Sequence, residues 1–496
     1  MKFSSLTNLF KKNQKTLKTP QSIILKKIKE VAQENNFSVY ENITVYHYAQ
    51  HIFIPILILD TNNSIHTFEL NDYTYKELNK QSLIKEMVEN AFDETLEARR
   101  PHNFIEQKLK EMLQEDTIAV SNHLVMENLN IEDYEHLSTA LKELMPFDEI
   151  LFNDSLNEDI LARIKETSSR NVFSKTALMS SILSQYSVVD SLDMRHLATP
   201  EQINFIDAPF AANEYLCGEN GTGRTYSLLL KVILQKLRNK DLKIVIIKPS
   251  TLTCDLLRKK LLSIIDSAML EVDIASIDVI TPIELLHRHL HAINKKIIGD
   301  EKYLSSILMQ KTFHIADTVI CDDSEHMSNE FLKYLRHIQK KANLLTISYM
   351  YAFTSHYTFT KNFKKESREF TFIQTNPHAK VLTLISSLLK EHHAKDILVL
   401  SSALTREKLY DDLEHFIDDG VALADSSKKL LQQELNSILL TTYEDIIPFE
   451  SRFLILLDLC FVSTEQLEDA IALCDGKIYV LYQNECEKIT LLRSLI

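Results

Sequence analysis

Glycine and tryptophan are scarce in this chain, and neither a membrane span nor a cysteine motif is visible. Tryptophan is absent, and only six glycines occur in 496 residues. The longest apolar runs, such as residues 52–59, are too short to cross a bilayer, and no apolar leader starts the chain. The six cysteines form no Cys-x-x-Cys pair. We therefore predict reduced core thiols in a cytoplasmic protein with no membrane partner.

Positive charge is also lacking over most of the chain. Residues 1–29 carry eight lysines and no acid, so the net charge of −14 leaves −22 for the remainder. Such an acidic body does not attract nucleic acid by charge alone. The lysine-rich start could be an arm that binds nucleic acid or a membrane surface. The favoured alternative is a solvated first helix.

Three of the six glycines lie together in residues 218–225, Gly-Glu-Asn-Gly-Thr-Gly-Arg-Thr. This spacing is typical of a phosphate-binding loop, in which backbone N–H groups and the start of the next helix face an anion. The position usually held by lysine is Arg224, which keeps the charge but spreads it over a planar fork. The alternative is a plain strand-turn-helix corner. We predict that the loop binds the phosphates of ATP through Gly218, Gly221, Thr222, Gly223, Arg224 and Thr225.

Two further motifs flank the loop at spacings that suit a nucleotide site. Asp322 and Asp323 end an apolar strand about 100 residues downstream, where an NTPase places acids that hold Mg²⁺ and orient the attacking water. We predict Thr225 and Asp322 as magnesium ligands, and Asp323 and Glu325 as the catalytic acids. Upstream, Gln202 is predicted to contact adenine, although Thr-Pro-Glu-Gln also suits an ordinary helix cap.

The apolar pattern predicts an α/β protein. Eight continuous apolar runs alternate with helical periodicity after residue 197, which favours two parallel sheets covered on both faces. They are 243–248, 277–281, 318–324, 343–348, 396–401, 437–443, 453–459 and 477–483. Before residue 197 the runs 38–47, 52–60 and 64–71 predict an α+β domain. The histidines at 287, 289 and 291 have no partners at metal-site spacing and are expected on a solvated helix face.

The order of these motifs resembles the superfamily-1 helicases of the UvrD/Rep type. Residues 316–339 follow that family's acid-strand pattern closely, and residues 242–262 are similar to its second strand. The resemblance implies two RecA-like P-loop domains, at 196–352 and 353–496. The comparison also shows that parts of the family's motifs are missing. The lysine-glycine pair of a later motif is replaced around Ile447 and Pro448, and only its glutamate, Glu450, is retained. Asp475 stands where an arginine belongs, so weak or lost ATP hydrolysis is expected.

The N-terminal region shows a second resemblance, to the nuclease-related NERD domain, which has a restriction-endonuclease-like fold. Residues 54–73 are similar to its metal-binding segment, with Glu69 matching the glutamate. Pro55 lies near the place of the aspartate and Asn71 replaces the lysine. The resemblance implies a NERD-like domain at 1–125 and a helical connector at 126–195, without nuclease activity.

Taken together, these features predict a nucleotide-binding, helicase- or translocase-like protein that uses ATP and Mg²⁺. Its expected partner is nucleic acid, single-stranded DNA above all. The alternative is a catalytically inactive, nucleotide-sensing scaffold for a partner protein in DNA repair or anti-phage defence.

Overall fold

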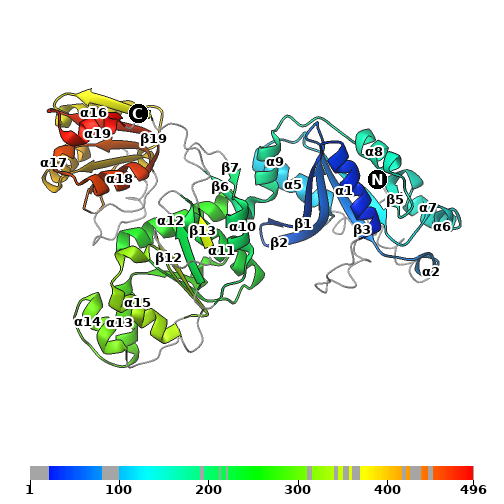
Figure 1. Ribbon diagram of the computed structural model, residues 1–496, viewed down its shortest axis with the longest axis horizontal. Helices are drawn as coiled ribbons and strands as arrows, with labels where there is room; N and C mark the ends of the chain where they lie inside the picture. Colours follow the sequence, from blue (N-terminus) through cyan, green and yellow to red (C-terminus); the bar gives the residue numbers. More distant parts are fainter. Residues whose placement is uncertain are drawn as a thin grey trace. The chain divides into compact units, whose positions relative to one another are not determined.

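The chain forms two compact units in the computed structural model (Figure 1). Residues up to Ser187, with Arg195–Leu197 and Ala268–Glu271, belong to the first unit. Val188–Met194, Ala198–Ser267 and Val272–Ile496 belong to the second. The structure describes residues 22–80, 100–189, 195–211, 214–218, 222–309, 316–339, 344–349, 357–359, 369–415, 420–424, 437–444 and 451–494.

A five-stranded sheet of order β1-β2-β3-β4-β5 is the centre of the first unit. The strands β1, β2 and β3 pair antiparallel, whereas β4 joins β3 and β5 joins β4 in parallel. The bounds are β1 Ser38–His47, β2 Gln50–Leu59, β3 Ile65–Asn71, β4 Val120–Met126 and β5 Ile150–Phe152. The three strands predicted from the sequence are thus confirmed within two residues.

Helices cover both faces of this sheet because β2 is apolar on both sides. Leu57 and Leu59 pack with helices α5 and α9, whereas Ile56 and Ile58 pack with α1 and α8. The helices are α1 Ile23–Glu34, α2 Tyr75–Leu78, α5 Pro101–Leu113, α6 Ile131–Glu135, α7 Thr139–Leu144, α8 Asn157–Glu166 and α9 Lys175–Ile182. A short pair, β6 Ser187–Val189 and β7 Arg195–Leu197, follows.

The region expected to be a helical connector, 126–195, differs from that expectation. It contains four of the helices, but β5 lies among them and pairs with β4. Three residues, Ile150–Phe152, are too few to give a period in the sequence, yet all three are buried. Most of the expected connector therefore belongs to the first unit, whose sheet continues beyond residue 125.

The second unit contains two six-stranded sheets, both entirely parallel. The first has the order β10-β9-β11-β12-β8-β13. Its strands are β8 Glu214–Gly218, β9 Ile244–Ile247, β10 Ile277–Ile280, β11 Thr318–Cys321, β12 Leu344–Tyr349 and β13 Tyr357–Phe359. Its helices are α10 Pro200–Asp207, α11 Arg224–Arg238, α12 Thr251–Ser267, α13 Pro282–Ala292, α14 Glu301–Leu308 and α15 Asn329–Gln339.

The second parallel sheet has the order β14-β19-β18-β15-β17-β16. Its strands are β14 Glu369–Gln374, β15 Ile397–Ser401, β16 Val421–Leu423, β17 Ile438–Thr442, β18 Ser451–Leu456 and β19 Cys474–Tyr482. Its helices are α16 Pro377–Leu388, α17 Ala403–Glu414, α18 Thr464–Ala472 and α19 Glu487–Ser494. The predicted α/β class with two parallel sheets is confirmed, and all eight predicted runs are strands.

Three expectations about individual side chains and spans have clear outcomes. Four cysteines are buried, but Cys460 is exposed and Cys486 is half-buried, so the set is not wholly a core set. His289 is not solvated: it is buried, and its ring hydrogen-bonds the Tyr334 hydroxyl. Among the described residues, the helices are all too short or too polar to traverse a bilayer.

Candidate functional site

The predicted phosphate loop joins the end of β8 to the start of α11. Gly218 is the last residue of the strand, and Gly223 caps the helix with a φ of +80°. This left-handed backbone favours glycine, because a Cβ there is strained. A Cβ at Gly223 would also lie 2.9 Å from Nε2 of Gln202. Gly221 falls in 219–221, outside the described residues.

Gln202 braces this loop from the first turn of α10. Its Oε1 accepts from the backbone N–H of Thr199 at 2.8 Å, completing a capping box. Its Nε2 donates to the backbone carbonyl of Thr222 at 2.8 Å, and the side chain is buried. Both polar atoms of Gln202 thus already bind the chain itself, and contact with adenine stays a prediction.

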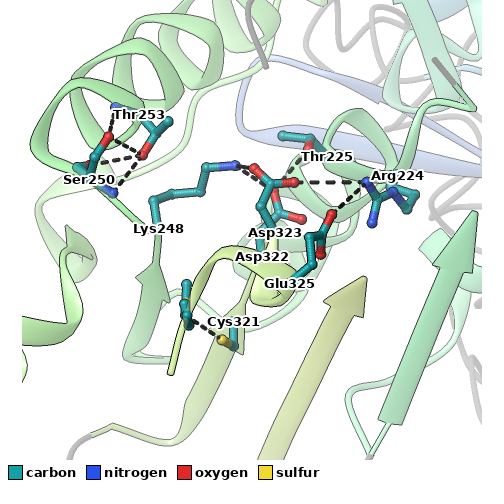
Figure 2. A network of polar contacts seen from close by, with 10 residues as sticks. Arg224, Thr225, Lys248, Ser250, Thr253, Cys321, Asp322, Asp323 and Glu325 are labelled. Atoms are coloured by element: carbon teal, nitrogen blue, oxygen red, sulfur yellow. Dashed lines mark hydrogen bonds and ion pairs between the residues drawn. The ribbon is translucent and has the colours of Figure 1, made fainter. Parts of the chain in front are cut away.

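The acid strand meets the loop at the same edge of the sheet. Asp322 and Asp323 follow β11 directly, and both are buried. The hydroxyl of Thr225 donates to Oδ2 of Asp322 at 2.8 Å, although the two residues are 97 positions apart (Figure 2). Carboxyl ends of parallel strands share one edge, which is where α/β sheets bind ligands. The sequence prediction that brought the loop and the acid strand together is consistent with this contact.

Arg224 faces the acids rather than solvent. Its Nη2 lies 3.4 Å from Oε1 of Glu325 and 4.0 Å from Oδ1 of Asp323. Burial raises the pKa of the Glu325 carboxyl, and the charge of Arg224 opposes that rise. Asp323 has a φ of +53°, so the chain turns sharply there and begins the short 3-10 turn Ser324–His326. This turn brings Glu325 next to Arg224.

Lys248 is the site residue that sequence reasoning missed. It follows β9, the strand beside β11, and its Nζ lies 3.0 Å from Oδ2 of Asp322 and forms an ion pair with Asp323 (Figure 2). The side chain is only 3% exposed, so this is a buried ion pair. A signal was present, because the lysine ends a predicted strand of the same parallel sheet.

The pKa shifts at this cluster follow from burial and charge in opposition. Burial alone lowers the pKa of the Lys248 ammonium, but Asp322 and Asp323 outweigh it and raise that pKa above its ordinary value. Burial alone raises the pKa of Asp322, but Lys248 and Arg224 outweigh it and hold that pKa below its usual range. Lys248 and Asp322 therefore both stay charged near neutral pH.

The expected magnesium ligands are brought together, but they do not fit a metal ion as they stand. A hydroxyl and a carboxylate are suitable donors for Mg²⁺. However, Oδ2 of Asp322 already accepts from both Thr225 and Lys248. Oδ1 of Asp322 is buried without a hydrogen-bond partner and is the one oxygen of this carboxylate left over. Among the described residues, no group of three or more His, Cys, Asp and Glu side chains is arranged to hold a metal.

The remaining sequence motifs lie at other places in the structure or outside the described residues. Glu69 lies buried in β3, and Oε2 is 3.8 Å from Nη2 of Arg100. Ile447, Pro448 and Glu450 lie outside the described residues. Position 475 is in β19, which runs parallel to β18.

Comparison with known proteins shows similarity only at the level of solved structures. No protein-family model and no curated protein matches the chain. The DEAD-box helicase Mss116 bound to ssRNA and UDP-BeF is 12% identical, with 67% of this chain and 77% of that chain covered and a TM-score of 0.40. The Escherichia coli DEAH/RHA helicase HrpB is 14% identical, with 59% and 42% covered and a TM-score of 0.36. The S. cerevisiae Dbp5 bound to RNA and ADP BeF3 is 11% identical, with 60% and 90% covered and a TM-score of 0.36. These values are too low to support an argument about activity.

Proposed function

We propose that the corner formed by the loop and the acid strand binds ATP, and that the chain is a helicase-like P-loop protein of the UvrD/Rep type with weak or lost hydrolysis. The contact between Thr225 and Asp322 at 2.8 Å is the observation that carries this proposal. A chance strand-turn-helix corner gives no reason for these two residues to meet.

In this proposal the phosphates lie against the backbone of the loop. The first backbone N–H groups of an α-helix have no acceptor within the helix, and the helix dipole favours an anion at that end. Arg224 begins the helix and lies at the same corner. Binding requires that Arg224 exchange its contact with Glu325 for one with a phosphate oxygen, since both compete for the same guanidinium.

We attribute weak or lost ATP hydrolysis to the ion pairs between the charged side chains at this corner. Arg224 and Lys248 supply two positive charges, and Asp322, Asp323 and Glu325 supply three negative ones. The carboxylate of Asp323, predicted to orient the attacking water, is held by Lys248 instead. A carboxylate that already binds a buried ammonium is not free to accept a hydrogen bond from the attacking water.

Single-stranded DNA is proposed as the partner because of the sequence resemblance alone. If hydrolysis is absent, the same site serves a nucleotide-sensing scaffold for a partner protein in DNA repair or anti-phage defence. A contribution of Glu69 to nuclease chemistry is not proposed, because Pro55 and Asn71 replace its two expected partners.

Nucleotide titration and ATPase assays on the wild type, Arg224→Lys and Arg224→Ala test this function, with and without single-stranded DNA. We expect the wild type and Arg224→Lys to bind ATP, and Arg224→Ala to bind at least about tenfold more weakly, because one charge-assisted contact is lost. Hydrolysis that single-stranded DNA stimulates indicates a motor, and its absence indicates a scaffold. Equal binding by all three proteins, or no binding by the wild type, would contradict the proposal.

A Gln202→Leu variant separates bracing of the loop from contact with adenine. If Gln202 acts only through Thr222, the variant binds ATP and GTP more weakly by the same factor. If it also contacts adenine, the loss is larger for ATP than for GTP.

A further inference from the structure

Lys248 lies where a nucleotide site with two acids would otherwise face a metal ion. Its ammonium group forms ion pairs with Asp322 and Asp323, one of which is 3.0 Å long. Figure 2 shows the side chain extending from the end of β9 to the two carboxylates. Both acids and the lysine are at least 97% buried.

The lysine and a metal would compete for the same oxygen atom. Oδ2 of Asp322 accepts from Lys248 and from Thr225. Mg²⁺ demands six oxygens at about 2.0–2.1 Å in near-ideal octahedral geometry. The partnerless Oδ1 of Asp322 offers a single further ligand. A dication there would also be repelled by the fixed ammonium at short range in a buried site.

The lysine is also held in place at its backbone. The N–H of Lys248 donates to the carbonyl of Ile280 at 3.0 Å, which fixes the residue at the edge of the sheet. Its side chain is 3% exposed, so the ammonium cannot turn to solvent without removing the nearest positive charge from two buried carboxylates.

We propose that Lys248 is the resident cation of this acid pair and excludes a divalent metal from it, so that nucleotide binding at this corner is independent of Mg²⁺. The exclusion of a metal by Lys248 is independent of the proposed function, whereas nucleotide binding without Mg²⁺ rests on the proposed nucleotide site. Lys248 thereby determines which form of the nucleotide the site accepts, free or metal-bound. It would also contribute to the weak or lost hydrolysis proposed above, because the site would lack the charge stabilisation that Mg²⁺ supplies to phosphoryl transfer.

The first test measures metal binding without any nucleotide. Mn²⁺ is titrated into the wild type, Lys248→Met and the charge-balanced double variant Lys248→Met/Asp323→Asn, with bound and free Mn²⁺ distinguished by electron paramagnetic resonance. We expect Lys248→Met to bind Mn²⁺ over a concentration range in which the wild type binds none. The double variant keeps Asp322 and removes one charge of each sign, so we expect it to be less destabilised than the single variant and to serve if the single variant unfolds. Thermal unfolding checks all three proteins.

The second test compares affinity for a fluorescent ATP analogue in EDTA and in Mg²⁺. We expect less than about a threefold difference for the wild type, and at least about tenfold tighter binding with Mg²⁺ for Lys248→Met. Mn²⁺ binding by the wild type that Asp322→Asn abolishes, or a tenfold loss of wild-type affinity in EDTA, would overturn the inference. If no protein binds the analogue but Mn²⁺ binds as expected, the proposed function fails while the role of Lys248 as resident cation stands.

Discussion

The left-handed backbone at Gly223 gives the sharpest test of the loop, because the chain contains a matched control. Gly223 has a φ of +80°, and an added Cβ would lie 2.9 Å from Nε2 of Gln202. Gly420 precedes β16 in the other parallel sheet, has a φ of +84°, and its added Cβ would lie 2.9 Å from Oγ of Ser437. The substitutions Gly223→Ala and Gly420→Ala therefore impose closely similar strain at different places.

Each substitution should cost about 1–3 kcal/mol in the free energy of unfolding, because a residue with a side chain is strained in this region. Only Gly223→Ala should weaken nucleotide binding. Its Cβ displaces the amide of Gln202, which holds the carbonyl of Thr222. Losing one backbone N–H contact to a charged phosphate costs about 1.5–3 kcal/mol, which is about tenfold or more in affinity.

The assay is titration of a fluorescent ATP analogue, with thermal unfolding measured on the same samples. The reasoning is refuted if Gly223→Ala binds as tightly as the wild type. It is refuted equally if Gly420→Ala loses as much affinity as Gly223→Ala, since the effect would then reflect general destabilisation.

Two further predictions concern stability. Glu214→Gln should lower the free energy of unfolding in urea by about 3–5 kcal/mol, because it leaves the buried ammonium of Lys231, 2.8 Å from the Glu214 carboxylate, without its counter-charge. The control Asp207→Asn, in an exposed ion pair, should lower it by less than about 1 kcal/mol. Similar losses for the two variants would contradict this prediction. Burial lowers the pKa of His289 to about 4, so between pH 6.5 and 4 the unfolded chain binds a proton that the folded chain does not, and stability falls as the pH falls. The thermal unfolding temperature of His289→Gln should therefore decrease less steeply with acid than that of the wild type. An unchanged slope would refute this prediction.

The strand pattern could be predicted well from the sequence because buried parallel strands are continuous apolar runs. All eight runs predicted after residue 197 are strands. The strands after the loop that sequence reasoning missed, β13, β14 and β16, are short or lie at a sheet edge. β13 and β16 have three residues each, and β14 is an edge strand with no fully buried residue. Half-buried edges carry no continuous apolar signal.

The candidate site was predicted only in part. A motif gives the spacing of residues along the chain, but it does not show which side chains compete for the same hydrogen-bond partner. The meeting of Thr225 with Asp322 could be expected from the spacing of two strand ends. The contacts of Lys248 depend on β9 lying beside β11, and the order of strands in a sheet is not readable from local pattern. The double use of the Gln202 amide likewise depends on how α10 packs against the loop.

The place of β5 in the N-terminal sheet decides how this chain can be divided. Truncation at residue 125, the predicted end of the N-terminal domain, would remove Met126 and β5. It would leave Leu124 and Val125 at an open, apolar edge with unpaired backbone groups. Open edges of this kind recruit strands from other molecules. With β5 in place, the strand at this edge of the sheet has only three residues, and very short edge strands are one way in which proteins limit pairing between molecules.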